Sequence, residues 1–479
     1  MSNKNLKKNY ILNLTYQLLT IILPFITTPY VARVLQAEGS GAYGYTLANA
    51  NFIGIFAVMG MDVYGQLQVA KYREDKVACS KLLYGICFAK LFTTVVTISV
   101  YFALESKIGM YRNLYWIMVL FFLAQAVDFT WFFQGMEEFT FIVTRNVLVK
   151  IVGIICVFVF VKEKEDVVIY ALIMQGTVLA GNLIAIPYLR RFIALIPISQ
   201  IRILPHIRGS MIYFIPTIAT SVYTMLDKAM IGWITKSSYE NGYYEQAYKI
   251  VQIVLVVVTS LRTVTLPRMV HLYNEKNYKQ VKEMVDGTIR FILFLSLPMS
   301  VGLIMVAPQL VPIFLGEGYE KCIIIVRILA ILIVILGLST LISGQCLTAM
   351  DKQKQANSCV IAGAVINFTM NLLLIPRCAA LGASIATVTA ETIILIMFIV
   401  FATEYIRLKD VSKYFFKYLL CSLVMAVCIY GLKYTKLQSM GLFISEIAVG
   451  IIVYFTALLL IKDDMLLNFI YNVKHKRFD

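Results

Sequence analysis

The chain has 479 residues, of which 60% are hydrophobic and only 15% are charged. Soluble globular proteins carry roughly 45–50% apolar and about 25% charged residues. This composition excludes a soluble enzyme, a soluble nucleic-acid-binding protein and a disordered protein, and it predicts an integral membrane protein. The formal net charge of +16 is explained by basic residues that set membrane orientation, so no nucleic-acid partner is expected.

Fourteen apolar runs, each bounded by charged or turn residues, follow one another along the chain. They cover residues 10–34, 42–62, 82–104, 113–134, 140–161, 167–189, 210–233, 243–266, 290–314, 322–348, 357–375, 380–402, 412–432 and 440–461. A helix of about 20 residues crosses the hydrocarbon core, whereas the strands of a membrane barrel are much shorter. We therefore predict an all-α integral membrane fold with about 14 transmembrane helices.

Lysine and arginine are unevenly distributed between the two sides of these helices. The two termini and every second connection between helices hold 25 lysines and arginines in total. The remaining connections hold 10. Positive residues mark the cytoplasmic side, so both termini are expected in the cytoplasm. The longest inner connection, 190–209, separates two groups of six helices. We predict two pseudo-symmetric six-helix lobes, 1–200 and 201–405, and an extra helix pair with a cytoplasmic tail in 406–479.

The outer connections are short, which limits the chemistry that the chain can perform. They offer no loop or domain that would hold catalytic carboxylates, so we expect a protein that is not an enzyme. Residues 39–44, GSGAYG, match the G-x-G-x-x-G pattern of a dinucleotide-binding loop. That pattern needs a strand before it and a helix after it, so we interpret it here as a turn between the first two helices.

Basic residues inside the apolar runs are the strongest functional signal. Each costs about 2.5–3.5 kcal/mol at the centre of a bilayer, although those near helix ends, Lys249 and Lys417, can extend to the interface. The deeper ones should face the protein interior or a wet cavity, where several cations together favour an anion such as a phosphorylated headgroup. These deeper residues are Lys90, Arg145, Lys150, Arg262 and Arg327.

Asp128 and Arg145 flank the turn between the fourth and fifth helices almost symmetrically. They should therefore meet at one depth in the membrane. One interpretation is a structural ion pair that pins the helical hairpin, and the other is a direct role in holding the substrate.

A second group of polar residues lies in the later helices. Asn367 and Asn371 are four residues apart and share a helix face, with Thr387 at a similar depth and Asp227 beside Lys228 in the seventh helix. A carboxylate with amide and hydroxyl oxygens suits a hard cation such as Na⁺, and the alternative is polar packing between helices.

Glu391 lies near the middle of the twelfth helix. It is either a proton-coupling group or the partner of Arg327. No cofactor is expected beyond Na⁺ or H⁺ as a coupling ion.

Three segments resemble signatures of a known family. They are residues 29–35 (PYVARVL) with Gly41 and Tyr43, residues 128–139 (DFTWFFQGMEEF) continuing to Arg145, Asn146 and Lys150, and residues 226–232 (LDKAMIG) through 242–245 to 266–269. Over about residues 10–405 the chain resembles the Wzx-like oligosaccharide flippases, the polysaccharide transporter family of the multidrug/oligosaccharidyl-lipid/polysaccharide superfamily. Gln36 departs from the pattern, because relatives usually have glycine there.

The resemblance implies two six-helix lobes around a central cavity in a bacterial cytoplasmic membrane. It implies an undecaprenyl-pyrophosphate-linked oligosaccharide repeat unit as substrate, moved by alternating access to the outer leaflet for capsule or O-antigen assembly. It places Arg33 and Arg262 in the cavity and suggests a cation in the second lobe. Membrane lipid, a polysaccharide polymerase and a chain-length regulator are the partners that it suggests. A multidrug exporter of the same fold and a membrane polysaccharide polymerase or ligase remain alternatives.

Overall fold

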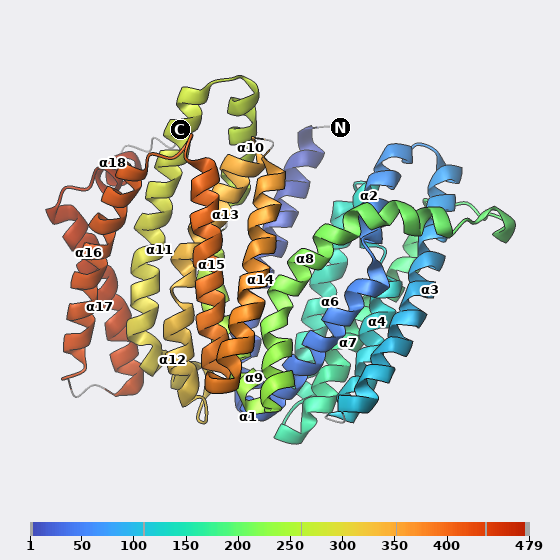
Figure 1. The fold of residues 1–479 in the computed structure, drawn as a ribbon, viewed down its shortest axis with the longest axis horizontal. Helices are drawn as coiled ribbons and strands as arrows, with labels where there is room; N and C mark the ends of the chain where they lie inside the picture. Colours follow the sequence, from blue (N-terminus) through green and yellow to red (C-terminus); the bar gives the residue numbers. More distant parts are fainter. Residues whose placement is uncertain (1–2, 109–110, 260, 351, 436–437, 475–479) are drawn as a thin grey trace. The chain divides into compact units, whose positions relative to one another are not determined.

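The computed structural model describes residues 3–108, 111–259, 261–350, 352–435 and 438–474, and within them the regular structure is helical, without strands. The α-helices are α1 (Asn3–Val58), α2 (Met61–Tyr72), α3 (Lys76–Ile108), α4 (Arg112–Ala126), α5 (Thr130–Gly135), α6 (Phe139–Phe160), α7 (Val167–Leu189), α8 (Leu204–Thr235), α9 (Ser238–Thr259), α10 (Leu261–Asn274), α11 (Tyr278–Leu315), α12 (Glu320–Leu329), α13 (Leu332–Leu341), α14 (Gln353–Cys378), α15 (Ala380–Ala402), α16 (Leu408–Leu432), α17 (Ser439–Leu460) and α18 (Asp464–Lys474). Short 3₁₀ turns lie at Lys164–Asp166 and Ile198–Gln200, and a π-helical turn at Ile342–Thr348. Figure 1 shows these helices along the chain.

The helical segments confirm the predicted all-α membrane fold. Ten of those in the described part of the chain are long and apolar enough to cross a membrane, and counting the bent pair 23–58 and 61–72 gives eleven. Each of the fourteen predicted apolar runs falls in helical segments. The bent pair overlaps the run at 10–34, and the runs at 210–233 and 243–266, parts of which lie outside the described residues, are not among the spans found in the described part of the chain. The count of fourteen transmembrane helices therefore stays a prediction.

Helix α1 contains the first two predicted helices, separated by a break at one residue. Gln36 has a φ of 55° and a ψ of −176°, a conformation that glycine adopts far more easily than glutamine. The break therefore lies at the residue where the family resemblance leads us to expect glycine. The turn predicted at residues 39–44 is wrong, because the helix resumes directly after Gln36.

The glycines of that segment serve close packing of helices. A Cβ atom on Gly41 would overlap the carbonyl oxygen of Ser238, and one on Gly242 would overlap the carbonyl oxygen of Ala37. Small residues let helix backbones approach in a membrane. The glycine-rich pattern at residues 39–44 therefore marks a helix–helix contact and not a turn.

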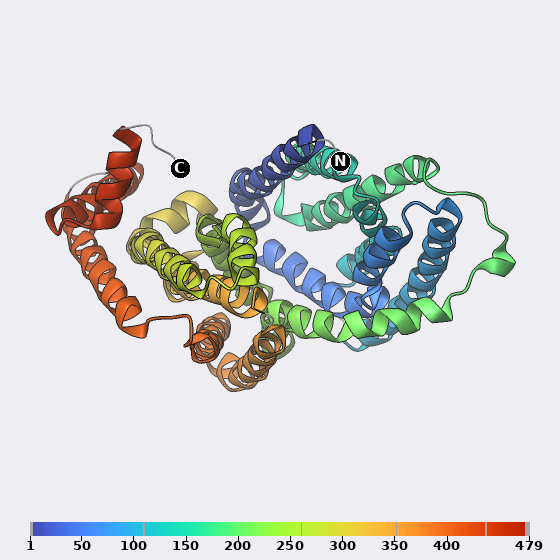
Figure 2. The same ribbon diagram turned by 90° about the horizontal axis from the view of Figure 1, so that it is seen from above.

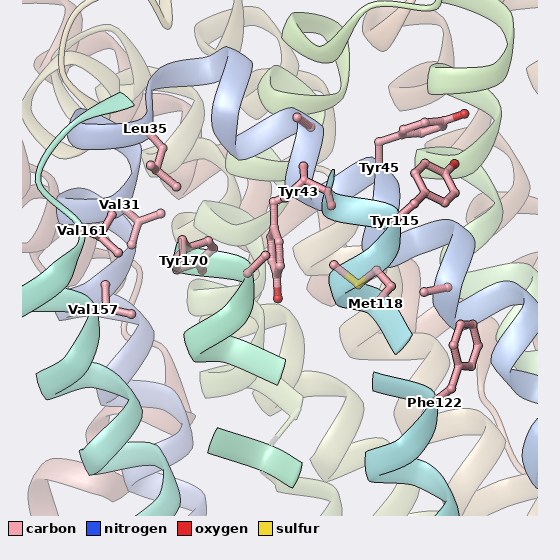
Figure 3. Close-up of a cluster of buried hydrophobic side chains, with 14 of the residues drawn as sticks. Val31, Leu35, Tyr43, Tyr45, Tyr115, Met118, Phe122, Val157, Val161 and Tyr170 are labelled. Atoms are coloured by element: carbon pink, nitrogen blue, oxygen red, sulfur yellow. The ribbon is translucent and has the colours of Figure 1, made fainter. Parts of the chain in front are cut away.

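Packing divides the chain into two compact units, Met1–Gly242 (unit 1) and Tyr243–Asp479 (unit 2). A tyrosine-rich cluster fills part of the interior of unit 1, as Figure 3 shows for Tyr43, Tyr45, Tyr115 and Tyr170. The hydroxyl of Tyr43 accepts a hydrogen bond from Gln175 at 2.9 Å. Buried tyrosines need such partners for their polar ends, so this cluster is both apolar and hydrogen-bonded.

Unit 2 is built on the long helix α11, against which α12, α13, α16 and α17 pack. Figures 1 and 2 show α11 in yellow, with the C-terminal helices α16 and α17 in red beside it. The Tyr454 hydroxyl on α17 donates to the carbonyl oxygen of Phe294 on α11 at 2.7 Å. Unit 1 includes α8, which packs against α1, α2 and α3. The predicted lobes 1–200 and 201–405, with the pair in 406–479, stay a prediction.

Candidate functional site

Among the predicted cations whose side chains the structure describes, Lys90 is the most deeply buried. Its side chain, on α3, is 1% exposed, and its Nζ donates to Asp62 Oδ1 on α2 at 2.8 Å and to the backbone oxygen of Asp128 at 3.3 Å. An ammonium group in an apolar interior is tolerated only with such partners. Lys90 therefore joins α2 and α3 to the segment that follows α4, and its predicted role in substrate binding stays a prediction.

Arg145, on α6, belongs to the same network of polar contacts around Asp128 as Lys90. The guanidinium Nη2 donates to Thr130 Oγ1 at 2.9 Å and to Asn146 Oδ1 at 2.9 Å. The Thr130 hydroxyl in turn donates to Asp128 Oδ1 at 2.5 Å. The predicted proximity of Asp128 and Arg145 is thus realised through Thr130. We call Asp62, Lys90, Asp128, Thr130 and Arg145 the charged chain of unit 1.

Two other predicted cations of unit 1 are accessible. The side chains of Arg33 on α1 and Lys150 on α6 are exposed, unlike those of Lys90 and Arg145, which are buried. Exposed cations are accessible to an anionic ligand from outside the packed interior. The side chain of Arg262 lies outside the described residues.

In unit 2, Arg327 on α12 is half-buried, and its Nε donates to the carbonyl oxygen of Ile304 on α11 at 3.1 Å. Glu391 is buried on α15, and α12 and α15 pack against each other. The predicted pairing of Glu391 with Arg327, and the alternative proton-coupling role, both stay predictions.

The residues of the predicted cation site are divided between the two units. Asn371 Nδ2 donates to Asn367 Oδ1 at 3.1 Å, as expected for residues four apart on one face of α14. The hydroxyl of Thr387 on α15 lies 3.1 Å from that of Tyr244. Asp227 is buried beside the half-buried Lys228 in unit 1, so the complete site stays a prediction.

The described residues include no group of three or more histidine, cysteine, aspartate or glutamate side chains that could hold a metal ion.

A polar cluster that the sequence did not predict lies where α17 ends and α18 begins. Asp463 is fully buried; its Oδ2 lies 2.5 Å from Lys417 Nζ and 3.2 Å from Arg290 Nη2. Its Oδ1 accepts hydrogen bonds from the backbone N–H groups of Met465 and Leu466, at 3.0 and 3.1 Å. Asp463 thus caps α18 and neutralises two cations from α11 and α16.

These contacts also set the charge state of Asp463. Burial by itself would raise the pKa of this carboxyl group. The hydrogen bonds from Lys417 and the Leu466 backbone, with the charge of Arg290, outweigh that effect and hold the pKa below its usual value. Asp463 is therefore ionised at neutral pH.

Comparison with protein families identifies the chain. The model described as "Polysaccharide biosynthesis protein" matches residues 6–273, and the MatE model matches residues 214–373. The first match covers more than half of the chain.

Two named relatives agree with these matches. A protein of Escherichia coli (strain K12) named as an O-antigen transporter is 21% identical over 402 residues, which cover 83% of this chain and 96% of that protein. A protein of Haloferax volcanii named as a low-salt glycan biosynthesis flippase is 21% identical over 239 residues, or 50% of each chain.

Solved structures show the same fold. The lipid II flippase MurJ, in an inward closed conformation, matches with a TM-score of 0.75 and 18% identity, over 95% of this chain and all of that chain (100%). An inward-facing multidrug resistance transporter of the MATE family matches with a TM-score of 0.60 and 12% identity, over 82% of this chain and 99% of that one. These comparisons confirm the resemblance to Wzx-like transporters, and the chain is a multi-pass membrane protein that belongs to the polysaccharide biosynthesis protein family.

Proposed function

We propose that this protein is a flippase for lipid-linked oligosaccharides and that it is not an enzyme. Its substrate is an undecaprenyl-pyrophosphate-linked repeat unit, which it moves by alternating access from the inner to the outer leaflet of the bacterial cytoplasmic membrane. The product supplies a surface polysaccharide of the capsule or O-antigen type. Family membership and the names of the relatives support transport of a glycan on a lipid carrier.

The observation that carries the proposal is the set of cationic side chains on apolar helices. In unit 1, Arg33 and Lys150 are exposed, while Lys90 and Arg145 are anchored in the charged chain. We assign Arg33 and Lys150 to the pyrophosphate, because arginine and lysine bind phosphate oxygens through charge-assisted hydrogen bonds; Arg262 is proposed as a further substrate-binding cation on the basis of the family resemblance. Arg145 lies five residues before Lys150 on the same helix and supports that group.

The membrane potential supplies a driving force for such a substrate. With the cytoplasm negative, outward movement of each negative charge is favoured by about 2.3 kcal/mol per 100 mV. The potential alone can therefore drive transport. A Na⁺ or H⁺ gradient would add to this driving force through the carboxyl group of Asp227 or of Glu391, both of which lie in apolar helices.

The MatE match over residues 214–373 favours a second candidate, a multidrug exporter of the same fold. Exporters of cationic compounds need acidic cavities, whereas most of the charges within the apolar runs of this chain are basic. A polymerase or ligase would need catalytic groups on the outer face, where the connections are short. In our account a polysaccharide polymerase and a chain-length regulator act on the product after transport.

Transport by the purified protein in liposomes tests the energy source. We expect the rate for lipid-linked oligosaccharide to rise with potential, up to about fiftyfold per 100 mV for each charge crossing the whole field, which corresponds to about 2.3 kcal/mol. Imposed Na⁺ and pH gradients, applied separately at zero potential, identify the coupling ion. Transport of cationic drugs with no movement of the oligosaccharide would instead support the multidrug exporter.

A further inference from the structure

Glu446 is a buried carboxyl group outside the candidate site. It lies on α17, in the C-terminal helix pair, and its side chain is 0% exposed. Neither of its carboxyl oxygens has a hydrogen-bond partner. Asp463, the other buried carboxyl group of this region, accepts hydrogen bonds through both of its oxygens. The two groups therefore differ in the feature that decides whether a buried carboxylate can remain ionised.

The position of Glu446 along α17 places it within the apolar part of the bilayer. Seven residues separate it from Ser439, where the helix begins, so it lies about 10 Å along the helix from that end at about 1.5 Å per residue. Closer to the C-terminal end of α17, Tyr454 is hydrogen-bonded to Phe294 of α11, and Gly450 packs against Ile429 of α16. These contacts hold the α17 face that carries Glu446 against α11 and α16.

Charged groups are absent from the helix segments that face Glu446. Helix α11 has none between Arg290 and Glu317, and α16 has none between Lys417 and Lys433. On α17 itself, Glu446 is the sole charged residue. The other titratable groups in these segments titrate well above neutral pH in their unperturbed state; they are Tyr418, Cys421, Cys428, Tyr430 and Tyr454. Helix α18 contacts α17 as well, and it begins beyond the C-terminal end of α17, at the segment that Asp463 caps.

Lys433, at the end of α16, is the described cation that acts on Glu446. Its side chain is exposed, and its Nζ lies over the ring of Tyr430 at 5.2 Å from the centroid. It forms no hydrogen bond with either Glu446 oxygen. Lys433 therefore does not compensate for burial of a charged carboxylate.

We propose that Glu446 is a proton-binding site, occupied by a proton while α17 is packed against α11 and α16. A neutral carboxylic acid fits this apolar, unpartnered position, whereas a carboxylate would be an uncompensated buried charge. Loss of the proton favours separation of α17 from its neighbours, because separation admits water to the carboxylate. The C-terminal pair is thus a proton-dependent contact, and this inference does not depend on the identity of the transported substrate.

Infrared spectroscopy of the full-length protein in lipid nanodiscs at neutral pH tests the proton directly. We expect a protonated-carboxyl C=O band in the wild type that is lost in Glu446→Gln and retained in Glu317→Gln, a matched change at an exposed residue just after the end of α11. Identical bands in the wild type and Glu446→Gln would overturn the proposal. Labelling supplies a second readout: dicyclohexylcarbodiimide, which reacts with protonated carboxyl groups in apolar surroundings, should modify Glu446, and absence of labelling would contradict the proposal.

Hydrogen–deuterium exchange tests the consequence for packing. After correction for the intrinsic effect of pH on exchange, raising the pH should increase exchange in α17 peptides of the wild type. Glu446→Gln should abolish this increase, because an amide cannot ionise, and Glu317→Gln should retain it. Glu446→Met tests whether the fold is retained. If Glu446 is neutral in the folded protein, its replacement by the apolar methionine should change Tm little. The same pH response in the wild type and Glu446→Gln would show that the proton on Glu446 does not control the contact.

Discussion

Replacing Arg145 by alanine is expected to abolish export of the lipid-linked oligosaccharide while the protein remains in the membrane. The guanidinium is buried and bonded to Thr130 and Asn146, and it lies one and a half turns before the exposed Lys150 on α6. Its removal takes away a buried positive charge that supports Lys150, which we assign to the pyrophosphate. We expect the export rate to fall by at least tenfold, equivalent to about 1.4 kcal/mol.

The Arg145 experiment separates substrate binding from a structural role. Export is measured in cells that depend on this protein, together with the amount of protein in the membrane. Thr130→Val is the matched control, because it removes the link between Arg145 and Asp128 and keeps the cation. Wild-type export in both Arg145→Ala and Arg262→Ala would contradict the cationic site. Loss of the protein from the membrane would assign Arg145 to pinning the helical hairpin.

Replacing Asp463 by asparagine is expected to cause the largest loss of stability. The carboxylate is fully buried between Lys417 and Arg290, and removing one partner of a buried ion pair costs about 3–5 kcal/mol. Asparagine can still cap α18, so the substitution isolates the effect of the charge. We expect Tm in detergent to fall by about 3–5 °C for a chain of this length, as measured by thermal unfolding.

Asp464→Asn is the matched control for Asp463→Asn. Asp464 is the next residue, 80% exposed and 3.9 Å from Arg290, so its loss should change Tm little, as for other exposed pairs. Equal decreases of Tm in the two variants would contradict the stabilising role that we assign to the buried carboxylate of Asp463.

The pH dependence of stability follows from the same contacts. The pKa of Asp463 is held below its usual value in the folded protein, so its contribution is fully present above the usual carboxyl pKa of about 3.9. That contribution is lost as the pH falls through the folded-state pKa. Acid should therefore reduce the difference in Tm between the wild type and Asp463→Asn, and a difference that stays constant down to acid would contradict this explanation.

The sequence predicted the helical content and the proximity of Asp128 and Arg145, because both follow from local patterns. Apolar runs fix where helices lie, and residues placed symmetrically about a turn must come together. The same reasoning could not identify Thr130 as the link between them. That role depends on a break after Ala126, inside the predicted fourth helix, after which the short helix α5 begins at Thr130.

Partners on separate helices could not be predicted in the same way. Lys90 pairs with Asp62, 28 residues earlier, and Lys417, expected to extend to the interface, pairs with Asp463. A helix that is apolar all round gives no signal for its rotation, so the sequence cannot tell which side chains face each other. The turn predicted at residues 39–44 failed for another reason, since Gly41 serves close packing.

The most direct test of the proposed function uses spheroplasts depleted of this protein. It measures which leaflet of the membrane holds the lipid-linked oligosaccharide. Membrane-impermeant reagents or lectins added outside distinguish the two leaflets, and lysed spheroplasts give the total. Our account predicts complete repeat units that accumulate on the inner leaflet and become accessible again when the protein is restored. Repeat units that reach the outer leaflet normally, with only polymer missing, would contradict the account and place the protein after translocation, as a polymerase or ligase.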